Sequence, residues 1–295
     1  MSTSARKLTN SVMLTLCMLG AALAILVLGL VLLFLMSKGL RYMSWHLFTR
    51  LPDNVNYRQG GIAQSIFGTL TLLGLASVMG LPLGILGGIY QLEARGRFAS
   101  LVRFFTDVLN GIPSIVIGIF AYAAVVVPTA KAHPGQTAFT AYAGGFALGI
   151  LMIPTVMRTT EEILRLVPFS LREASLGLGA TRWRTMWSVV LPSARGGVIT
   201  GIMLALARIA GETAPLLFTI LGNEFFETHK VAGISVPTLN APIDALPLRI
   251  YNYSQMPNAD LNNIAWAGAI ILITMILVLS IAARYATRSN LLEEK

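Results

Sequence analysis

Six apolar segments of membrane length divide this 295-residue chain. A helix needs about 20 mainly apolar residues to cross a hydrocarbon core, and each segment reaches that length. Backbone groups in lipid must satisfy their own hydrogen bonds, so helices are the expected form. The composition agrees, with 55% hydrophobic and 12% charged residues. The sequence predicts an all-α integral membrane protein with transmembrane helices at 12–36, 62–92, 101–128, 138–157, 197–221 and 263–286.

The basic residues between these spans predict the orientation. An even number of spans places both termini on one side, and that side carries about twice as many lysines and arginines as the other. By the positive-inside rule, both termini are then cytoplasmic. The net charge of +9 is spread over short loops rather than gathered on one face. We therefore expect a membrane protein with lipid around it and no nucleic-acid partner.

Glycine and proline are frequent inside segments two to four, for example at Gly80, Gly111, Pro113 and Pro154. Small residues let helices approach closely in lipid, and glycine with proline also permits unwound half-helices. Close packing is the simpler explanation for any one of them. The longest external loop, 222–262, has the length to meet an external partner.

A polar segment at 158–195, between spans four and five, has its own helix signals. Ser170 and Glu173 stand at capping-box spacing, which predicts the start of a short helix, and Gly177 with Gly179 would end it. Thr181 then caps a second, amphipathic helix that Pro192 closes. The expected apolar face of that second helix is Trp183, Met186, Trp187 and Val190.

Two charged residues fall near the middle of the predicted fifth span. An ionisable group there costs about 2.5 to 3.5 kcal/mol on insertion scales, so Arg208 and Glu212 should face a pathway or a partner. At i and i+4 they would share one helix face, about 6 Å apart. A guanidinium suits an oxyanion; a structural ion pair is the alternative. In span three, Asp107 is expected to pair with Arg103, with a pathway role as the alternative.

The polar segment resembles a signature of ABC-importer permeases, E-A-A-x-x-x-G-x9-I-x-L-P, with Ser175 and Val189 in place of its second alanine and its isoleucine. In that family this loop forms a coupling helix that sits in a groove of the cytoplasmic ATPase. The resemblance therefore implies a cytoplasmic coupling helix between spans four and five. The residues that it assigns to coupling are Arg172, Glu173, Ala174, Gly179, Leu191 and Pro192.

Further runs resemble the PstA-type permeases of phosphate-specific ABC importers, which are type I, MetI-like permeases. They are Arg208–Pro215, Pro113–Val116, Pro154–Glu161 and Leu166–Ala174. The resemblance implies that Arg208, Glu212 and Thr213 belong to a substrate pathway. It also places Arg158 at the cytoplasmic end of that pathway, although a basic flank of the span is an equal alternative.

This resemblance implies a permease subunit of an inorganic phosphate importer in the bacterial inner membrane. Its expected partners are a homologous PstC-like permease, a dimer of PstB-like ATPase subunits and a periplasmic PstS-like phosphate-binding protein. The chain lacks a G-x-x-x-x-G-K-[ST] loop. ATP and Mg²⁺ are therefore expected in the partner ATPase, and the chain itself is not expected to be an enzyme or to hold a cofactor or metal.

The resemblance also implies three parts: a tail, first span and external loop at 1–61, a permease core at 62–287 with its coupling loop at 158–195, and a cytoplasmic tail at 288–295. Rival functions stay open. One is an ABC permease for another oxyanion, such as molybdate, sulfate or phosphonate. A passive anion channel would have no use for a coupling loop, and a hydrolase would need a nucleophile and base that the three loop histidines do not supply. A sensory scaffold is a further alternative.

Overall fold

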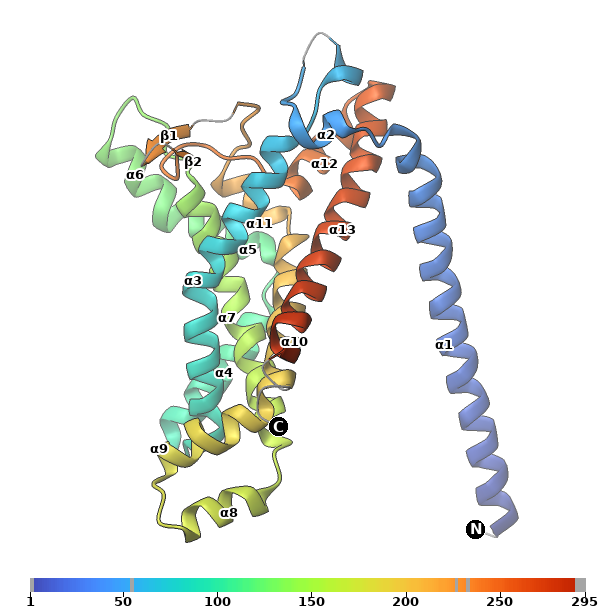
Figure 1. The fold of residues 1–295 in the computed structure, drawn as a ribbon, viewed down its shortest axis with the longest axis vertical. Coiled ribbons are helices and arrows are strands. Elements are labelled where there is room, and N and C mark those ends of the chain that lie inside the picture. The colour runs from blue at the N-terminus through green and yellow to red at the C-terminus, as the bar shows by residue number, and fades with distance from the viewer. Residues whose placement is uncertain (1–2, 54–55, 226–227, 232–233, 290–295) are drawn as a thin grey trace.

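The computed structural model describes residues 3–53, 56–225, 228–231 and 234–289, and it is a bundle of long helices (Figure 1). Short helices and one hairpin lie at its two ends. The helices are α1 (Thr3–Gly39), η1 (Leu40–Tyr42), α2 (Trp45–Thr49), η2 (Tyr57–Gln59), α3 (Ala63–Glu93), α4 (Arg97–Gly111), α5 (Ser114–Ala121), η3 (Tyr122–Val126), α6 (Val127–Ala132), α7 (Ala141–Arg165), α8 (Phe169–Gly177), α9 (Arg182–Thr185), η4 (Met186–Val190), α10 (Leu191–Ala210), α11 (Ala214–Thr219), α12 (Leu246–Gln255) and α13 (Ala259–Ser289).

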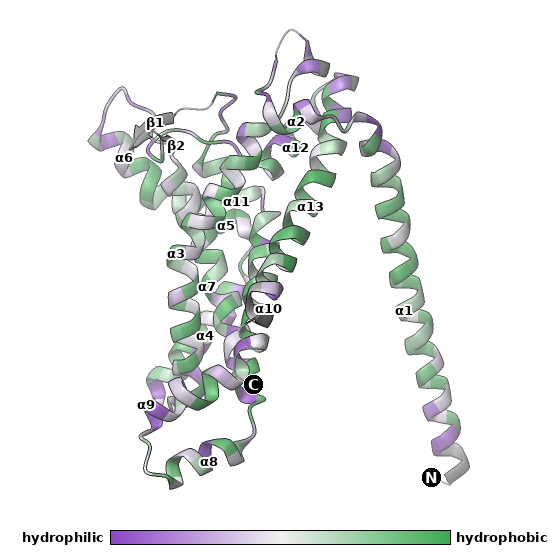
Figure 2. Cartoon of the chain, in the orientation of Figure 1, coloured by the Kyte–Doolittle hydropathy of each residue, from purple (hydrophilic) through white to green (hydrophobic). Residues whose placement is uncertain are grey.

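Six helical stretches of the described chain are long and apolar enough to cross a membrane, as predicted. They are Arg6–Tyr42, Ala63–Glu93, Ser114–Ala132, Ala141–Arg165, Arg182–Ala210 and Ala259–Tyr285. Figure 2 shows hydrophobic residues along most of their length and hydrophilic residues at α8, at α9 and in the opposite loops. The predicted fold class is confirmed, but the third and fifth spans differ from their predicted boundaries.

The third span is interrupted rather than continuous from 101 to 128. Helix α4 ends at Gly111, Ile112 and Pro113 are extended with ψ angles of 132° and 136°, and α5 begins at Ser114. Proline has no amide hydrogen and pushes the preceding residue out of the helical region, so the helix stops and restarts there. The sequence indicated that glycine and proline permit such unwinding, but it did not predict this position. Pro154, by contrast, stays inside α7.

The fifth span begins earlier and ends earlier than the predicted 197–221. One helical stretch runs from Arg182 through the π-helical turn η4 into α10 and ends at Ala210. The chain is then unwound until α11 starts at Ala214. Pro215 stands in the first turn of α11, where its missing amide hydrogen costs nothing.

Helices α3 and α7 pack most closely together at the centre of the bundle. A β-carbon at position 84 of α3 would lie 2.6 Å from the Cβ of Val156 on α7, so glycine is required there. Gly80 and Gly88, one turn on either side, face α7 in the same way. Leu72, Leu148, Met152, Val156 and Ile209 belong to the buried cluster around this contact.

Helix α1 stands apart from the rest of the bundle (Figure 1). It meets α13 near one end, where the Phe34 ring lies edge-on to Trp266 at 5.5 Å, and most of its remaining side chains are exposed. Both marked chain ends lie toward the end of the bundle that carries α8 and α9 (Figure 1). Residues 290–295 of the predicted C-terminal tail lie outside the described residues.

The loop between α11 and α13 is more ordered than the sequence indicated. Strands β1 (Thr228–Val231) and β2 (Ile234–Pro237) form an antiparallel hairpin, and α12 follows it. Sequence patterning missed both elements because neither carries a long apolar run. The hairpin lies at the opposite end of the bundle from α8 and α9 (Figure 1).

Candidate functional site

Arg208 lies in the last turn of α10, against the middle of α7. Its Nη1 donates a hydrogen bond of 3.3 Å to Oγ1 of Thr155, which is about 15 Å along the helix axis from the end of α7 at Arg165. The arginine side chain is exposed, although it projects from a membrane-length helix. It forms no ion pair with any described residue. The Arg208 guanidinium is therefore an exposed cation near the middle of the bundle's length.

The predicted sharing of one helix face by Arg208 and Glu212 is wrong. Helix α10 ends at Ala210, so Glu212 and Thr213 lie in the unwound segment before α11. Gly211 caps the last turn through its amide, which donates to the carbonyl of Arg208 at 3.2 Å. Within the described chain the two charges are not paired, which also removes the alternative of an ion pair between them.

Arg158 lies three residues after Thr155 on α7, and therefore on the same face one turn closer to α8. Its Nε donates to Oε1 of Glu162 at 2.8 Å, and its side chain is half exposed. The structure thus brings two of the predicted pathway residues, Arg208 and Arg158, to one polar face of α7. Arg158 has a carboxylate partner and Arg208 has none among the described residues.

Sequence reasoning missed Glu161, a buried carboxylate at the same end of α7. It lies 2.5 Å from Arg165, 3.5 Å from Arg103 of α4 and 3.9 Å from Arg158. The predicted Arg103–Asp107 pair is wrong, because Arg103 reaches Glu161 and the backbone carbonyl of Gln91 instead. The i, i+4 spacing of Glu161 and Arg165 was a usable signal. The contact with Arg103 joins residues far apart in sequence, and no local pattern indicates it.

The two interrupted spans meet each other. A β-carbon at Gly118 of α5 would lie 2.6 Å from the Cα of Pro215 at the start of α11, so the half-helices touch backbone to backbone. Ala210 and Leu216 beside one break belong to one buried cluster, and the partly buried Ile112 from the other break packs against it. Two broken spans therefore pack against each other beside their breaks.

The predicted coupling segment has a helix, but its start differs from the prediction. Helix α8 begins at Phe169, directly after Pro168, and Ser170 makes no cap hydrogen bond, so the capping box is wrong. The proline already forces the chain out of the preceding helix and fixes the entry angle. The predicted end is confirmed: α8 stops at Gly177, and Gly179 has a left-handed φ of +86°.

The second half of the segment is continuous with the fifth span. Thr181 caps α9 as predicted, since its side chain accepts from the amide of Arg184 at 3.3 Å. Pro192 does not close a separate helix, because the π-helical turn η4 leads directly into α10. Nor do the four apolar residues form one buried face: Met186 and Val190 are buried, whereas the Trp183 and Trp187 rings are exposed and stack edge to face at 5.3 Å.

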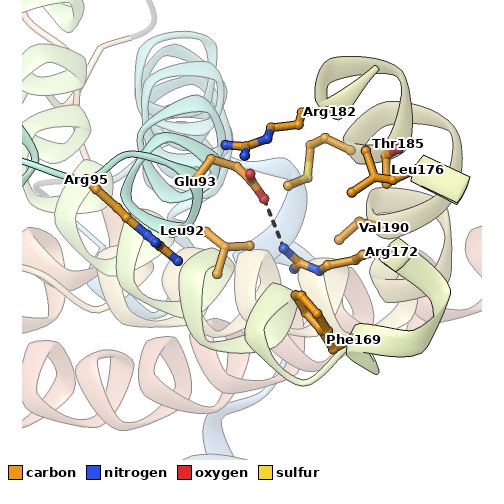
Figure 3. A pocket seen from close by; sticks show the side chains of 10 residues that line it. Leu92, Glu93, Arg95, Phe169, Arg172, Leu176, Arg182, Thr185 and Val190 are labelled. Atoms are coloured by element: carbon orange, nitrogen blue, oxygen red, sulfur yellow. Dashed lines mark hydrogen bonds and ion pairs between the residues drawn. The ribbon is translucent and has the colours of Figure 1, made fainter. Parts of the chain in front are cut away.

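Helix α8 is held against the bundle by its inner face. Arg172 bonds to Glu93 at the end of α3 with Nη1 at 2.9 Å, and its Nη2 donates to the carbonyl of Leu164 at 3.0 Å. Ser175 of α8 and Thr185 of α9 join their hydroxyls at 2.9 Å. A cavity of about 420 Å³ remains between α8, α9 and the end of α3 (Figure 3).

The side of α8 that faces away from the cavity is exposed. Among the predicted coupling residues, Glu173, Ala174 and Gly179 lie on this exposed side, whereas Arg172 points inward. Leu191 is half buried and Pro192 is exposed, both on α10. The large apolar side chains exposed on and around α8 are Leu166, Phe169, Leu171, Leu176 and Leu178, of which Phe169 and Leu176 line the cavity. Among the described residues, no three His, Cys, Asp or Glu side chains could hold a metal ion.

Comparisons with known proteins agree on one family. Residues 80–290 match the model of the binding-protein-dependent transport system inner membrane component. The phosphate transport system permease protein PstA of Haemophilus influenzae is 38% identical over 95% of this chain and 94% of its own length. PstA of Pasteurella multocida is 40% identical over 95% of this chain and 94% of its own length.

Solved structures agree on the fold. A chain of a bacterial alginate ABC transporter covers 96% of this chain and 96% of its own length with a TM-score of 0.63 at 17% identity. A chain of the methionine ABC transporter MetNI, in an inward-facing conformation, covers 78% of this chain and 94% of its own length with a TM-score of 0.55 at 19% identity.

This chain has six spans, two of them interrupted, and a short helix between spans four and five. With the comparisons above, this fold defines an ABC-importer permease subunit. The chain belongs to the family of inner-membrane components of binding-protein-dependent transport systems, and within it to the PstA permeases. As a multi-pass inner-membrane protein of this class it works with an ATPase and a substrate-binding protein.

Proposed function

We propose that this chain is the permease subunit of an ATP-driven importer of inorganic phosphate and forms half of the translocation pathway. The observation that carries the proposal is Arg208, an exposed guanidinium at mid-span with no carboxylate partner in the described chain. A permanent charge there cannot face hydrocarbon without a cost of several kcal/mol. It should therefore face a pathway or a partner protein. The planar fork of the guanidinium matches a phosphate oxyanion, which favours the pathway.

The neighbouring polar groups support a pathway along α7. Thr155 orients Arg208, and Arg158 on the same face offers a second cation nearer the end that we place in the cytoplasm. Glu212 and Thr213 in the unwound segment lie beside Arg208 in sequence. A carboxylate near the arginine would keep a dianion from binding so tightly that it cannot leave.

The ATPase would dock on the exposed face of α8, through Glu173, Ala174, Gly179 and the apolar side chains around them. Their exposure and the inward anchoring of α8 by Arg172 support this role. ATP and Mg²⁺ would be held by a dimer of PstB-like ATPases, and both termini and α8 would lie in the cytoplasm. When the ATPases close, α8 would be carried with them, and the broken spans would rock to open the pathway.

The remaining partners would be a PstC-like permease and a periplasmic PstS-like phosphate-binding protein. The unpacked apolar surface of α1 supports the first, since a single helix gains packing contacts only from a neighbour. The α12 loop and its hairpin lie at the opposite end from α8, where the binding protein would deliver phosphate.

The test is ATP-driven uptake of radiolabelled phosphate into proteoliposomes that hold the whole complex and its binding protein. Arg208→Gln should lower uptake at least about tenfold, because it removes a charge-assisted hydrogen bond to the substrate. Arg97→Gln, an exposed arginine on α4, should transport as wild type does.

Excess sulfate and molybdate serve as competitors. Phosphate uptake that resists both and disappears in Arg208→Gln supports the substrate and the site. Uptake blocked by one competitor would point to an importer of that oxyanion, and undiminished uptake in Arg208→Gln would remove Arg208 from the pathway.

A further inference from the structure

Three cavities adjoin one another along one side of α3. The first is the cavity at α8 described above (Figure 3). The second, about 460 Å³, shares Glu93, Arg182 and Met186 with the first. The third, also about 460 Å³, shares Leu86 with the second. Because neighbouring cavities share lining residues, we describe them together as one groove from Pro82 to Glu93 on α3, with α9, η4 and α10 as its other wall.

One end of this groove is cationic. Arg95, Arg172 and Arg182 reach toward the same space, in which Glu93 is the one acidic residue of the lining (Figure 3). Arg172 already bonds to Glu93 at 2.9 Å. Arg95 and Arg182 have no ion-pair partner in the described parts of the chain. Two guanidinium groups are thus free to bind an anion there.

The rest of the groove is apolar and open to the outside. Leu86 is 48% exposed, and Trp183 and Trp187 stand beside it with 66% and 37% exposure. Arg195 alone among the described residues that line the third cavity carries a charge. Tryptophan is enriched at the level where hydrocarbon meets the headgroups, and Trp183 lines the second cavity together with Arg182.

The length of the groove decides what can fill it. Pro82 and Glu93 are eleven residues apart on α3, which is about 17 Å of helix. Half of a hydrocarbon core of about 30 Å is about 15 Å. The groove is therefore about as long as one leaflet of the hydrocarbon core is thick. Free phosphate would fill only the arginine end, so it leaves the apolar part unexplained.

We propose that this groove binds one anionic phospholipid of the leaflet on the side of α8 and α9. Its phosphate bonds to Arg95 and Arg182, and an acyl chain lies against Leu86 and Trp187. The lipid bridges the end of α3 and the start of α9, and so ties the segment that carries α8 to the bundle. Binding does not depend on which substrate the permease carries.

Native mass spectrometry of the full-length chain in detergent tests the proposal, with dioleoyl phosphatidylglycerol and dioleoyl phosphatidylethanolamine as probes at equal concentration. We expect one retained phosphatidylglycerol that binds at least about tenfold more weakly to Arg95→Gln/Arg182→Gln. Leu86→Trp narrows the groove and leaves the arginines unchanged, so it should weaken the binding of the same lipid. Arg184→Gln, an exposed arginine on α9 outside the lining, is the matched control.

The outcomes separate the possible occupants. Retention of phosphatidylglycerol over phosphatidylethanolamine, lost in both groove variants and kept in Arg184→Gln, supports the site. Equal retention of the two lipids, or retention unaffected by both variants, overturns it as a nonspecific lipid shell. Displacement of the lipid by inorganic phosphate at millimolar concentration would overturn it in favour of a free-anion site. A rise in the unfolding temperature with phosphatidylglycerol, absent from the double variant, gives a second readout that does not depend on uptake.

Discussion

At the scale of single residues, Arg249 and Arg208 show the difference between a buried, ion-paired arginine and an exposed one. Arg249 of α12 is 5% exposed and bonds Asp244 at 2.7 Å and Glu224 at 2.9 Å, with the Tyr253 ring 5.1 Å from its guanidinium carbon. Arg208 is exposed, and among the described residues its side chain bonds only to the hydroxyl of Thr155. The first arrangement stabilises the fold, whereas the second leaves most donors of the guanidinium available for a ligand.

This contrast predicts that the same substitution has a large effect on stability at Arg249 and a small one at Arg208. Arg249→Met leaves the Asp244 carboxylate buried without its cation and should lower the free energy of unfolding by about 3 to 5 kcal/mol. Arg208→Met should change it by less than about 1 kcal/mol, because no buried partner is orphaned. Denaturation of both variants in the same detergent measures the difference. A large loss of stability in Arg208→Met would mean that Arg208 is structural. In the double variant, Asp244→Asn should recover part of the stability that Arg249→Met loses.

At the scale of elements, the sequence predicted what depends on length and local chemistry. The six spans follow from apolar length, and the turn at Gly179 follows from the backbone freedom of glycine. The break at Pro113 was not predicted, because the apolar run continues through it from 101 to 128. The break at Gly211 was missed, although Pro215 marked the start of a new helix, because the apolar run continues through it. The bonds from Arg208 to Thr155 and from Arg103 to Glu161 join distant segments, and only tertiary packing decides them.

In the turn after α8, Gly179 gives a prediction for docking of the ATPase, and Gly177 two residues earlier is its control. Gly179 has a φ of +86°, so Gly179→Ala should cost about 1 to 2 kcal/mol and change how α8 leaves its turn. Gly177 is helical and has open space around it, so Gly177→Ala should be neutral or slightly stabilising. The amount of ATPase subunit that co-purifies with each variant is the measurement. Equal recovery from both variants would show that docking does not depend on this turn.

At the scale of the whole molecule, α1 is the feature that a single chain leaves unexplained. The helix has 37 residues, meets α13 near one end, and exposes apolar side chains along most of its length (Figure 2). Association of helices in a membrane comes from packing and not from the hydrophobic effect, so a span without neighbours contributes little to a monomer. Its natural place in the proposed complex is against the second permease subunit.

The single cysteine of the chain makes this arrangement testable without adding another. Cys17 is exposed in the middle of α1, and a photoactivatable maleimide attached there should cross-link the second permease when the assembled complex is irradiated. The same label on the isolated chain should capture only lipid or detergent, and Cys17→Ser should give no cross-link at all. A complex that assembles and transports, yet whose label captures lipid alone, would place α1 in the bilayer and leave the permease contact to the other five spans. Because the cross-link reports assembly and the uptake assay reports the pathway, failure of one leaves the other conclusion standing.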